Sequence, residues 1–113
     1  MQRYLISFDD GSMDHIPDAD WPQVGEASHA VVQEAKDAGV WIWGGGVARQ
    51  QATIVGTDGS VTDGPVPETK AVIGGFSIIE VPSREEAVHW ASRFAAACRC
   101  AQEVREIGFD PAS

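Results

Sequence analysis

Basic residues are scarce in this chain of 113 residues. Eight Lys and Arg stand against seventeen Asp and Glu, which gives a formal net charge of -9, and Lys36 and Lys70 are the only lysines. Binding to nucleic acid needs clustered positive charge to neutralise phosphates, and the basic residues here are scattered. The composition therefore argues against a nucleic-acid partner and is typical of a soluble acidic domain.

Long apolar runs are also missing. No stretch approaches the roughly 20 apolar residues that cross a bilayer. The N-terminal segment MQRYLISFDD turns acidic where the apolar region of a signal peptide would run. We therefore expect no contact with a membrane, no secretion signal and a cytoplasmic location.

Cysteine occurs only twice, as Cys98 and Cys100. A disulfide across so short a spacing would be strained, which favours free thiols in a reducing cytoplasm. A single Cys-X-Cys lacks the second ligand pair of a structural zinc site, so zinc is only a weak alternative and we expect no metal. Gly44–Gly46 follows a predicted strand but does not lead into a helix, so it does not form a phosphate-binding loop. No nucleotide, flavin or haem motif is present, and we expect no cofactor.

The chain does have a regular succession of strand and helix patterns, and its length is natural for a single domain over residues 1–113. Residues 3–8 alternate in polarity and predict a strand. Apolar residues then recur at helical spacing, with Asp20 as the expected N-cap and Gly39 as the expected end. The segment VWIWGG predicts the next strand, in which strict alternation would place Trp41 and Trp43 on one face.

The second half contains a hairpin and then repeats this pattern. Residues 50–64, QQATIVGTDGSVTDG, predict a hairpin with Asp58-Gly59 at its turn. A long strand is expected from Lys70 to Val81, with a bulge or a close backbone approach at Gly74-Gly75. Ser83 begins a capping box for a second helix.

A final strand is predicted over residues 101–109, with Val104 and Ile107 as its apolar anchors. The order of elements is typical of an α+β, ferredoxin-like βαββαβ fold, here with an inserted hairpin. Both helices would pack on one sheet face, and the other face carries large side chains that need a cover. Two subunits that press these faces together are the simplest solution, so we expect a symmetric homodimer.

Two stretches carry a family resemblance: VTDGPVPETKAVIGGF at residues 61–76 and QEVREI at residues 102–107. They resemble the YCII-related (DGPF-domain) family, whose pattern has a DGPF-like turn, an ETKE-like step, two glycines before an aromatic residue and a closing EVRP strand. Val66 stands where Phe is usual in that family, and Glu106 where Pro is common. The resemblance implies a ferredoxin-like subunit in a dimeric α/β barrel with a cleft near the dimer face, and it implies no particular reaction.

For a shorter branch of that family, the resemblance also implies an acid–base pair of one His and one Asp. Aligned by eye, the helix histidine of that branch falls about one turn before His29. Its Asp-Pro step has no counterpart in RFAAACRC, residues 93–100. The pair is therefore not carried over, and a catalytic pair in this chain must be built from other residues.

Polar residues outside the predicted core supply candidates for such a pair: His15, Asp63 and Glu68. His15 lies in a polar loop, and an imidazole can exchange protons near neutral pH. Asp63 begins an Asp-Gly-Pro turn, which can hold its carboxylate at the mouth of a cleft. Glu68 shares a face with Lys70 in an extended chain. Structural alternatives stay open: a solvated loop for His15, turn chemistry for Asp63, and a surface ion pair for Glu68 with Lys70.

Trp43, Lys70 and Arg105 are the candidate substrate-binding residues. Trp43 offers a flat wall for a planar ligand, although core packing or a dimer face also explains it. Lys70 and Arg105 can hold an anionic group, although an ion pair explains Arg105 equally well, because Glu103 lies on the same strand face.

Two functions fit these candidate catalytic and substrate-binding residues. The first is a cofactor-independent enzyme that moves protons on a small metabolite, as isomerases and lyases do. The second is a non-catalytic dimer that binds a small ligand or a protein partner.

Overall fold

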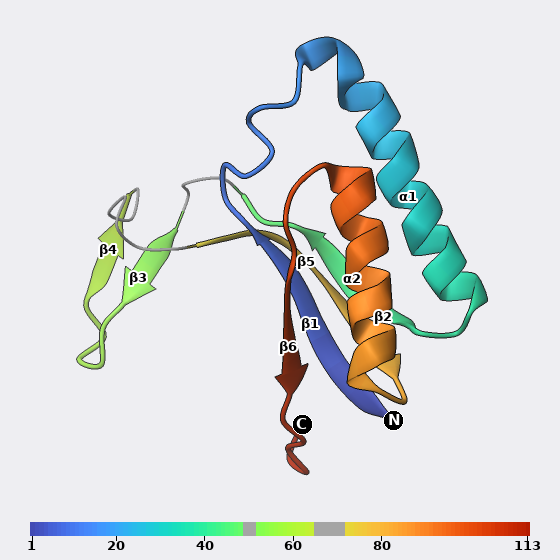
Figure 1. Cartoon of the computed structure of the whole chain (residues 1–113). Coiled ribbons are helices and arrows are strands. Elements are labelled where there is room, and N and C mark those ends of the chain that lie inside the picture. Colours follow the sequence, from blue (N-terminus) through green and yellow to red (C-terminus); the bar gives the residue numbers. More distant parts are fainter. Residues whose placement is uncertain (49–51, 65–71) are drawn as a thin grey trace.

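The computed structural model describes residues 1–48, 52–64 and 72–113 (Figure 1). The elements follow in the order β1 (Gln2–Asp9), the 3-10 turn η1 (Asp18–Asp20), α1 (Trp21–Asp37), β2 (Trp41–Gly46), β3 (Thr53–Val55), β4 (Val61–Asp63), β5 (Ile73–Val81), α2 (Arg84–Cys98) and β6 (Glu103–Ile107). In this part of the chain, no helix is long and apolar enough to cross a membrane.

Within the described residues, β2, β5, β1 and β6 form one antiparallel sheet in that order. Each helix connects two parallel strands that have a third strand between them: α1 joins β1 to β2, and α2 joins β5 to β6. This is the split βαβ arrangement of the ferredoxin-like fold, so the predicted α+β class is confirmed. Both helices cover the same face of the sheet (Figure 1).

The core lies between this face and the helices. From the sheet it takes Tyr4, Ile6, Ile79 and Val81, from the residue before β2 it takes Val40, and from the helices it takes Val31, Ala35, Ala87, Ala91 and Phe94. The small alanines let α1 and α2 approach the sheet and each other closely, as ridges packed into grooves require. The helices therefore bury one apolar stripe each and leave their charged faces to water.

The two helices begin in different ways. Ser83 caps α2 as predicted, because its Oγ accepts a hydrogen bond of 3.2 Å from the backbone N–H of Glu86. Asp20 stands at the N-cap position of α1, but its side chain makes no cap hydrogen bond. Its Oδ2 instead accepts from Nη1 of Arg99, at 2.7 Å. The predicted N-cap position of Asp20 is therefore confirmed, but its carboxylate makes no cap hydrogen bond and instead links the start of α1 to the end of α2. Gly39, with a φ of +75°, ends α1 as expected.

A bulge in β2 corrects the prediction for two tryptophans. Trp41 pairs with Ile79 and Trp43 pairs with the adjacent Ile78, so β2 has one extra residue opposite β5. Neighbouring residues of β5 point to opposite faces, and therefore Trp41 and Trp43 do too. Trp41 lies on the helix side, with its ring 6.2 Å from that of Phe94. The expectation that the two tryptophans share a face is wrong.

Gly74 and Gly75 allow a close approach, as predicted. The register between β1 and β5 shifts between Phe8 and Asp9. A Cβ on Gly75 would stand 2.4 Å from the Phe8 ring, and a Cβ on Gly74 would stand 2.9 Å from Cα of Asp10. β5 begins at Ile73, and the predicted strand start at Lys70 lies outside the described residues.

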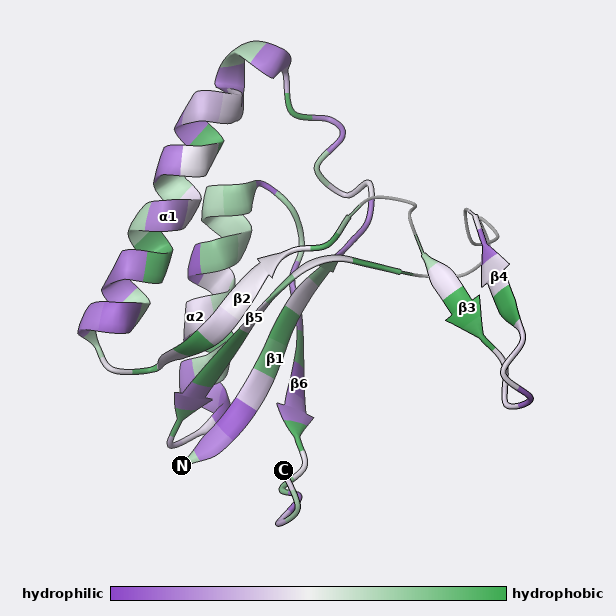
Figure 2. Cartoon of the chain, turned by 180° about the vertical axis from the view of Figure 1, so that it is seen from behind, coloured by the Kyte–Doolittle hydropathy of each residue, from purple (hydrophilic) through white to green (hydrophobic). Residues whose placement is uncertain are grey.

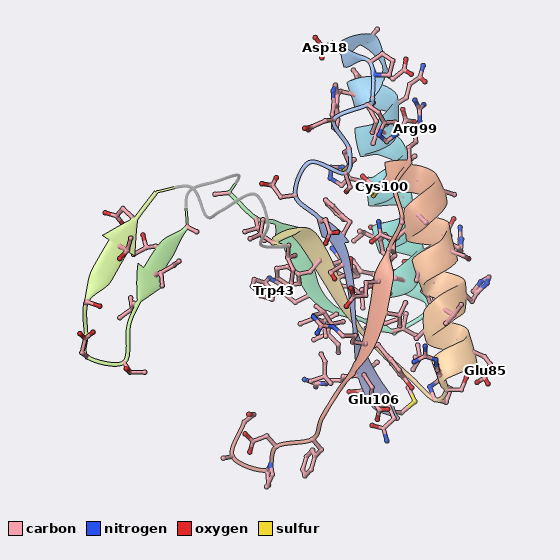
Figure 3. The ribbon with its side chains drawn as sticks, turned by 60° about the vertical axis from the view of Figure 1, so that its left-hand side comes forward. Asp18, Trp43, Glu85, Arg99, Cys100 and Glu106 are labelled. Carbon is pink, nitrogen blue, oxygen red and sulfur yellow. The ribbon has the colours of Figure 1, made fainter. Side chains whose placement is uncertain are left out.

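The predicted hairpin is also confirmed. β3 and β4 form a separate two-stranded antiparallel sheet. At its turn Gly59 has a φ of +84°, and Oδ1 of Asp58 accepts a hydrogen bond of 2.9 Å from the backbone N–H of Ser60. Figure 3 shows the helices on one side of the four-stranded sheet and this hairpin on the other.

Candidate functional site

The four-stranded sheet has one face that α1 and α2 leave uncovered, which we call the open face. In an antiparallel pair, residues directly opposite each other point to the same side, so the registers assign the side chains of this face in rows. The first row lies nearest to the sheet end where β1 finishes. The rows are, first, Gly45, Phe76, Ser7 and Glu103; second, Trp43, Ile78, Leu5 and Arg105; and third, Glu80, Arg3 and Ile107.

Trp43 and Phe76 form an aromatic pair on the open face. Their ring centroids are 5.1 Å apart with an angle of 68° between the planes, which is an edge-to-face contact. Trp43 is 64% exposed, and Figure 3 shows it on the side of the sheet away from the helices. Beside it, a Cβ on Gly45 would meet no atom within 4 Å. The pair therefore offers a bare aromatic surface to a planar molecule or to another protein surface.

Arg105 lies in the same row as Trp43 but at the opposite edge of the sheet. Its Nε donates to Oε1 of Glu103 at 2.8 Å, and the two side chains are 64% and 61% exposed. This confirms that Arg105 and Glu103 share a face. An ion pair so exposed adds little to stability, which leaves the guanidinium available to an anionic group. Three strand spacings separate Trp43 from Arg105, about 14 Å in all. A molecule that stacks on Trp43 therefore lies at the β2 edge of the face, and Arg105 lies at the β6 edge.

His15 lies in the loop between β1 and η1, at the sheet end nearest to the first row (Figure 1). Backbone hydrogen bonds of 3.1 Å fold this loop, including one from the N–H of Ile16 to the carbonyl of Met13. Ile16 is buried, whereas the imidazole of His15 is exposed. The backbone of His15 is thus held beside a buried anchor while its side chain faces solvent.

Asp63 lies on β4, and its Oδ1 accepts a hydrogen bond of 2.7 Å from Oγ1 of Thr53 across the hairpin. In the part of one chain that the structure describes, no contact joins Asp63 to His15. Figure 1 shows the hairpin apart from the loop that carries the histidine. Glu68 and Lys70 lie outside the described residues, so the roles predicted for them stay predictions.

Sequence reasoning did not select Phe76, Ser7 or Ser12. Ser7 is 5% exposed although it lies on the open face, between Phe76 and Glu103. Ser12 has a buried Oγ with no hydrogen-bond partner among the described residues. Alternation in the first strand already places Ser7 on its outer face, but no local pattern marks Phe76 as the partner of Trp43, because the bulge in β2 brings the two together.

The final strand, β6, has one apolar side chain packed against the core. It is Val104, as predicted for an apolar anchor of this strand. Ile107, the other predicted anchor, is 36% exposed in the third row and lies outside the core.

Cys98 and Cys100 are free thiols. Burial, with a smaller contribution from Cys100, raises the pKa of the Cys98 thiol from 9.0 to about 11, so this thiol is protonated and unreactive at neutral pH. Among the described residues, no group of three His, Cys, Asp or Glu side chains is placed to hold a metal ion.

A shallow cavity of about 540 Å³ lies at the other end of the sheet. It contains the ion pair in which Nε of Arg3 donates to Oε2 of Glu80 at 2.9 Å. The chain termini form its other walls, through Met1, Gln2 and residues of the segment Ile107–Ser113. His15 and Asp63 do not line it.

Comparison with known proteins adds two findings. Residues 21–108 match the model of a family described as the YCII-related domain. A solved structure of 5-chloro-2-hydroxyhydroquinone dehydrochlorinase from Burkholderia phenoliruptrix AC1100, in complex with 2,5-dihydroxybenzoquinone, is similar with a TM-score of 0.54. The similarity covers 99% of this chain and 98% of that one at 19% sequence identity, so it concerns the fold. No curated protein matches the sequence.

Proposed function

The chain belongs to the YCII-related family, and we propose that it is an enzyme that moves protons on a small molecule, without a cofactor, in a cleft at the face of a homodimer. Such a reaction is of the isomerase or lyase type. A base takes a proton from an acidic O–H or C–H bond of the substrate. The proton then returns at another atom, or an anion leaves as a new double bond forms.

The observation that carries this proposal is the bare aromatic pair on the open face. Trp43 is 64% exposed and contacts the ring of Phe76, with nothing above Gly45. A planar ring can stack on such a surface. The structurally similar dehydrochlorinase holds 2,5-dihydroxybenzoquinone, which is a small planar molecule, and its name denotes the removal of hydrogen chloride. Elimination of this kind needs a base and no electron carrier.

Each candidate residue is assigned a role in this reaction from the chemistry of its side chain. His15 is the proposed base, because its imidazole is exposed on a loop that backbone hydrogen bonds and the buried Ile16 hold in place. Asp63 or Glu68 is the proposed acid or the partner of the base. Arg105 and Lys70 are proposed to hold an anionic group of the substrate, such as the oxygen of an ionised hydroxyl.

Calorimetric titration with 2,5-dihydroxybenzoquinone tests the aromatic surface. Trp43→Ala should weaken binding about tenfold or more, because it removes the stacking surface. Trp21→Ala is the matched control, since Trp21 is 41% exposed at the start of α1, and it should leave the affinity unchanged. Equal affinities for the two variants would place the ligand elsewhere and contradict the proposal.

Turnover separates an enzyme from a binding protein. Chloride release from chlorinated hydroxyhydroquinones is a direct readout of elimination. His15→Ala should abolish this release and leave the melting temperature nearly unchanged, because the imidazole is exposed. A loss of stability of several kcal/mol would make His15 a structural residue instead.

One observation favours a second function. Within the described part of a single chain, His15 and Asp63 are not in contact, so these two residues do not form an acid–base pair there. On this alternative the chain is a non-catalytic dimer that binds a small ligand or a protein partner. Quinone binding that depends on Trp43, without chemical change of any hydroxyquinone tested, would support it.

A further inference from the structure

The chain exposes more surface than a compact domain of its mass. Its accessible surface is 7526 Å², whereas a compact monomer of 12.1 kDa exposes about 6000 Å². Its radius of gyration is 15.7 Å, against about 13 Å for a compact domain of this length. The surplus of about 1500 Å² exceeds the roughly 800 Å² that each partner buries in a standard protein interface. A surplus of this size is enough for an interface with another subunit.

The β3–β4 hairpin supplies part of this surplus. Ile54, Val55 and Val61 are 45%, 65% and 63% exposed. Figure 2 shows apolar residues on both strands of the hairpin. Two strands of three residues cannot bury these side chains against each other, and an isolated two-stranded hairpin is marginally stable in water. The main contacts of β3 and β4 in the described chain are with each other. Within the described residues, no other element packs extensively on the hairpin, and a surface of a second subunit can cover it.

Charge indicates where that surface is. Residues 52–64 contain Asp58 and Asp63 and no Lys or Arg. The hairpin lies on the open-face side of the sheet, and that face carries Arg105 at its β6 edge in an exposed pair with Glu103. The same chain thus holds an acidic, apolar arm and, on its uncovered face, an exposed arginine whose ion pair with Glu103 adds little to stability. A second copy satisfies both at once, because a two-fold axis repeats each contact.

The strand order decides which edges meet. The chain leaves the sheet for the hairpin from β2, which is one edge, and β6 is the other edge. If two open faces pack about 10 Å apart around an axis parallel to the strands, the β2 edge of each copy lies over the β6 edge of its partner. In this arrangement the Trp43 surface of one copy faces Arg105 of the partner subunit across the interface.

We propose that the β3–β4 hairpin packs on a second copy of this chain and places its Asp63 beside Arg105 on the open face of that copy. Each site then takes Trp43 and Asp63 from one subunit and Arg105 from the other. Within one chain these two residues stand on the outermost strands of the sheet, about 14 Å apart between backbones. The inference rests on the dimer of the proposed function and adds that each site is built from two subunits.

Charge reversal tests the contact in trans. Asp63→Arg and Arg105→Asp, each alone, should raise the dimer dissociation constant about tenfold or more in sedimentation equilibrium, because like charges then meet in both contacts. An equimolar mixture of the two variants should recover the mass of two chains. In the mixed dimer the introduced arginine meets the introduced aspartate, and the other contact keeps its native pair.

Apolar contact of the hairpin is tested with a matched control. Val55→Asp combined with Val61→Asp should shift the mass from two chains to one. Val88→Asp should keep the dimer, because Val88 is 47% exposed on α2, away from the open face. Far-ultraviolet circular dichroism should show the same helix content for all variants.

Three outcomes would overturn the inference: a monomeric wild type, a charge-reversal mixture that stays as weak as its components, or a Val88 control that dissociates as the hairpin variant does. The proposed function fails separately. Quinone binding without recovery in the mixture removes the exchanged hairpin and leaves the proposed function standing. Recovery without any quinone binding supports the exchanged hairpin and removes the proposed ligand.

Discussion

Two neighbouring glycines of β2 stand in opposite surroundings. A Cβ on Gly44 would lie 2.5 Å from the carbonyl oxygen of Phe76 and 2.9 Å from the ring of Trp41. A Cβ on Gly45 would meet no atom within 4 Å. Gly44 faces the helix side, where the bulge draws β2 close to β5, and Gly45 faces the open side. Packing therefore requires a glycine at position 44, whereas at position 45 the glycine only leaves the surface uncovered.

Alanine substitution should separate these two positions. Gly44→Ala should lower the free energy of unfolding by about 1–3 kcal/mol, because a backbone carbonyl must move to admit the methyl group. Gly45→Ala should change it by about 0.5 kcal/mol or less. Urea unfolding followed by circular dichroism measures both. Equal effects would mean that the bulge does not bring Gly44 against β5.

The N-terminus of α2 is better capped than the N-terminus of α1. Ser83 supplies the cap hydrogen bond to Glu86, and Glu85 and Glu86 place negative charge in the first turn. These carboxylates favour the positive end of the helix dipole. α1 has no side-chain cap hydrogen bond and no acidic residue in its first turn, and its N-cap residue Asp20 pairs with Arg99 instead. The start of α1 is therefore linked to the end of α2 by an exposed ion pair, which adds little to stability.

The contribution of the cap to stability can be measured by comparing the N-cap residue Ser83 with Ser92, which lies within α2. Ser83→Ala should destabilise the protein by about 1 kcal/mol, because the N–H of Glu86 loses its partner. Ser92→Ala should have almost no effect, since its exposed Oγ only donates to the carbonyl of His89 within the helix. Thermal unfolding of the two variants under one condition gives the comparison. A Ser92 effect as large as that of Ser83 would contradict the assignment.

At the scale of the whole molecule, the structure is flat and incompletely covered. Its principal extents are 45, 43 and 19 Å, and the shortest corresponds to a sheet with helices on one side only. The open face and the hairpin expose apolar groups, among them Trp43, Val55 and Val61. In the proposed dimer a second copy covers this surface, and folding is then linked to association.

This linkage predicts a melting temperature that rises with protein concentration, because dilution favours dissociation and then unfolding. Differential scanning calorimetry over about a hundredfold range of concentration measures it. The hairpin variant with Val55→Asp and Val61→Asp should lose the dependence, and the Val88→Asp variant should keep it. A wild-type melting temperature that does not change with concentration would contradict the proposed link between folding and dimer formation.

Whether a site residue could be predicted from the sequence depended on whether its strand alternates regularly. Arg105 and Glu103 share a face because β6 is regular, so simple alternation was enough. Trp41 and Trp43 do not, because one extra residue in β2 reverses the alternation, and that bulge depends on contacts with β5. The same bulge creates the Trp43–Phe76 pair. The contact between His15 and a carboxylate remains a prediction, since it depends on residues far apart in the sequence.

The sequence by itself determined the elements and their order. Cap residues, turn glycines and apolar spacing act within a few residues, so the helix over residues 21–37, the Asp58-Gly59 turn and the Ser83 cap follow from local chemistry. The tertiary structure alone decided which face each side chain occupies at the bulge and which ion pair Asp20 forms at the start of α1. It also decided how much surface the fold leaves open. These features depend on pairing between distant segments, whose energy no short stretch of sequence contains.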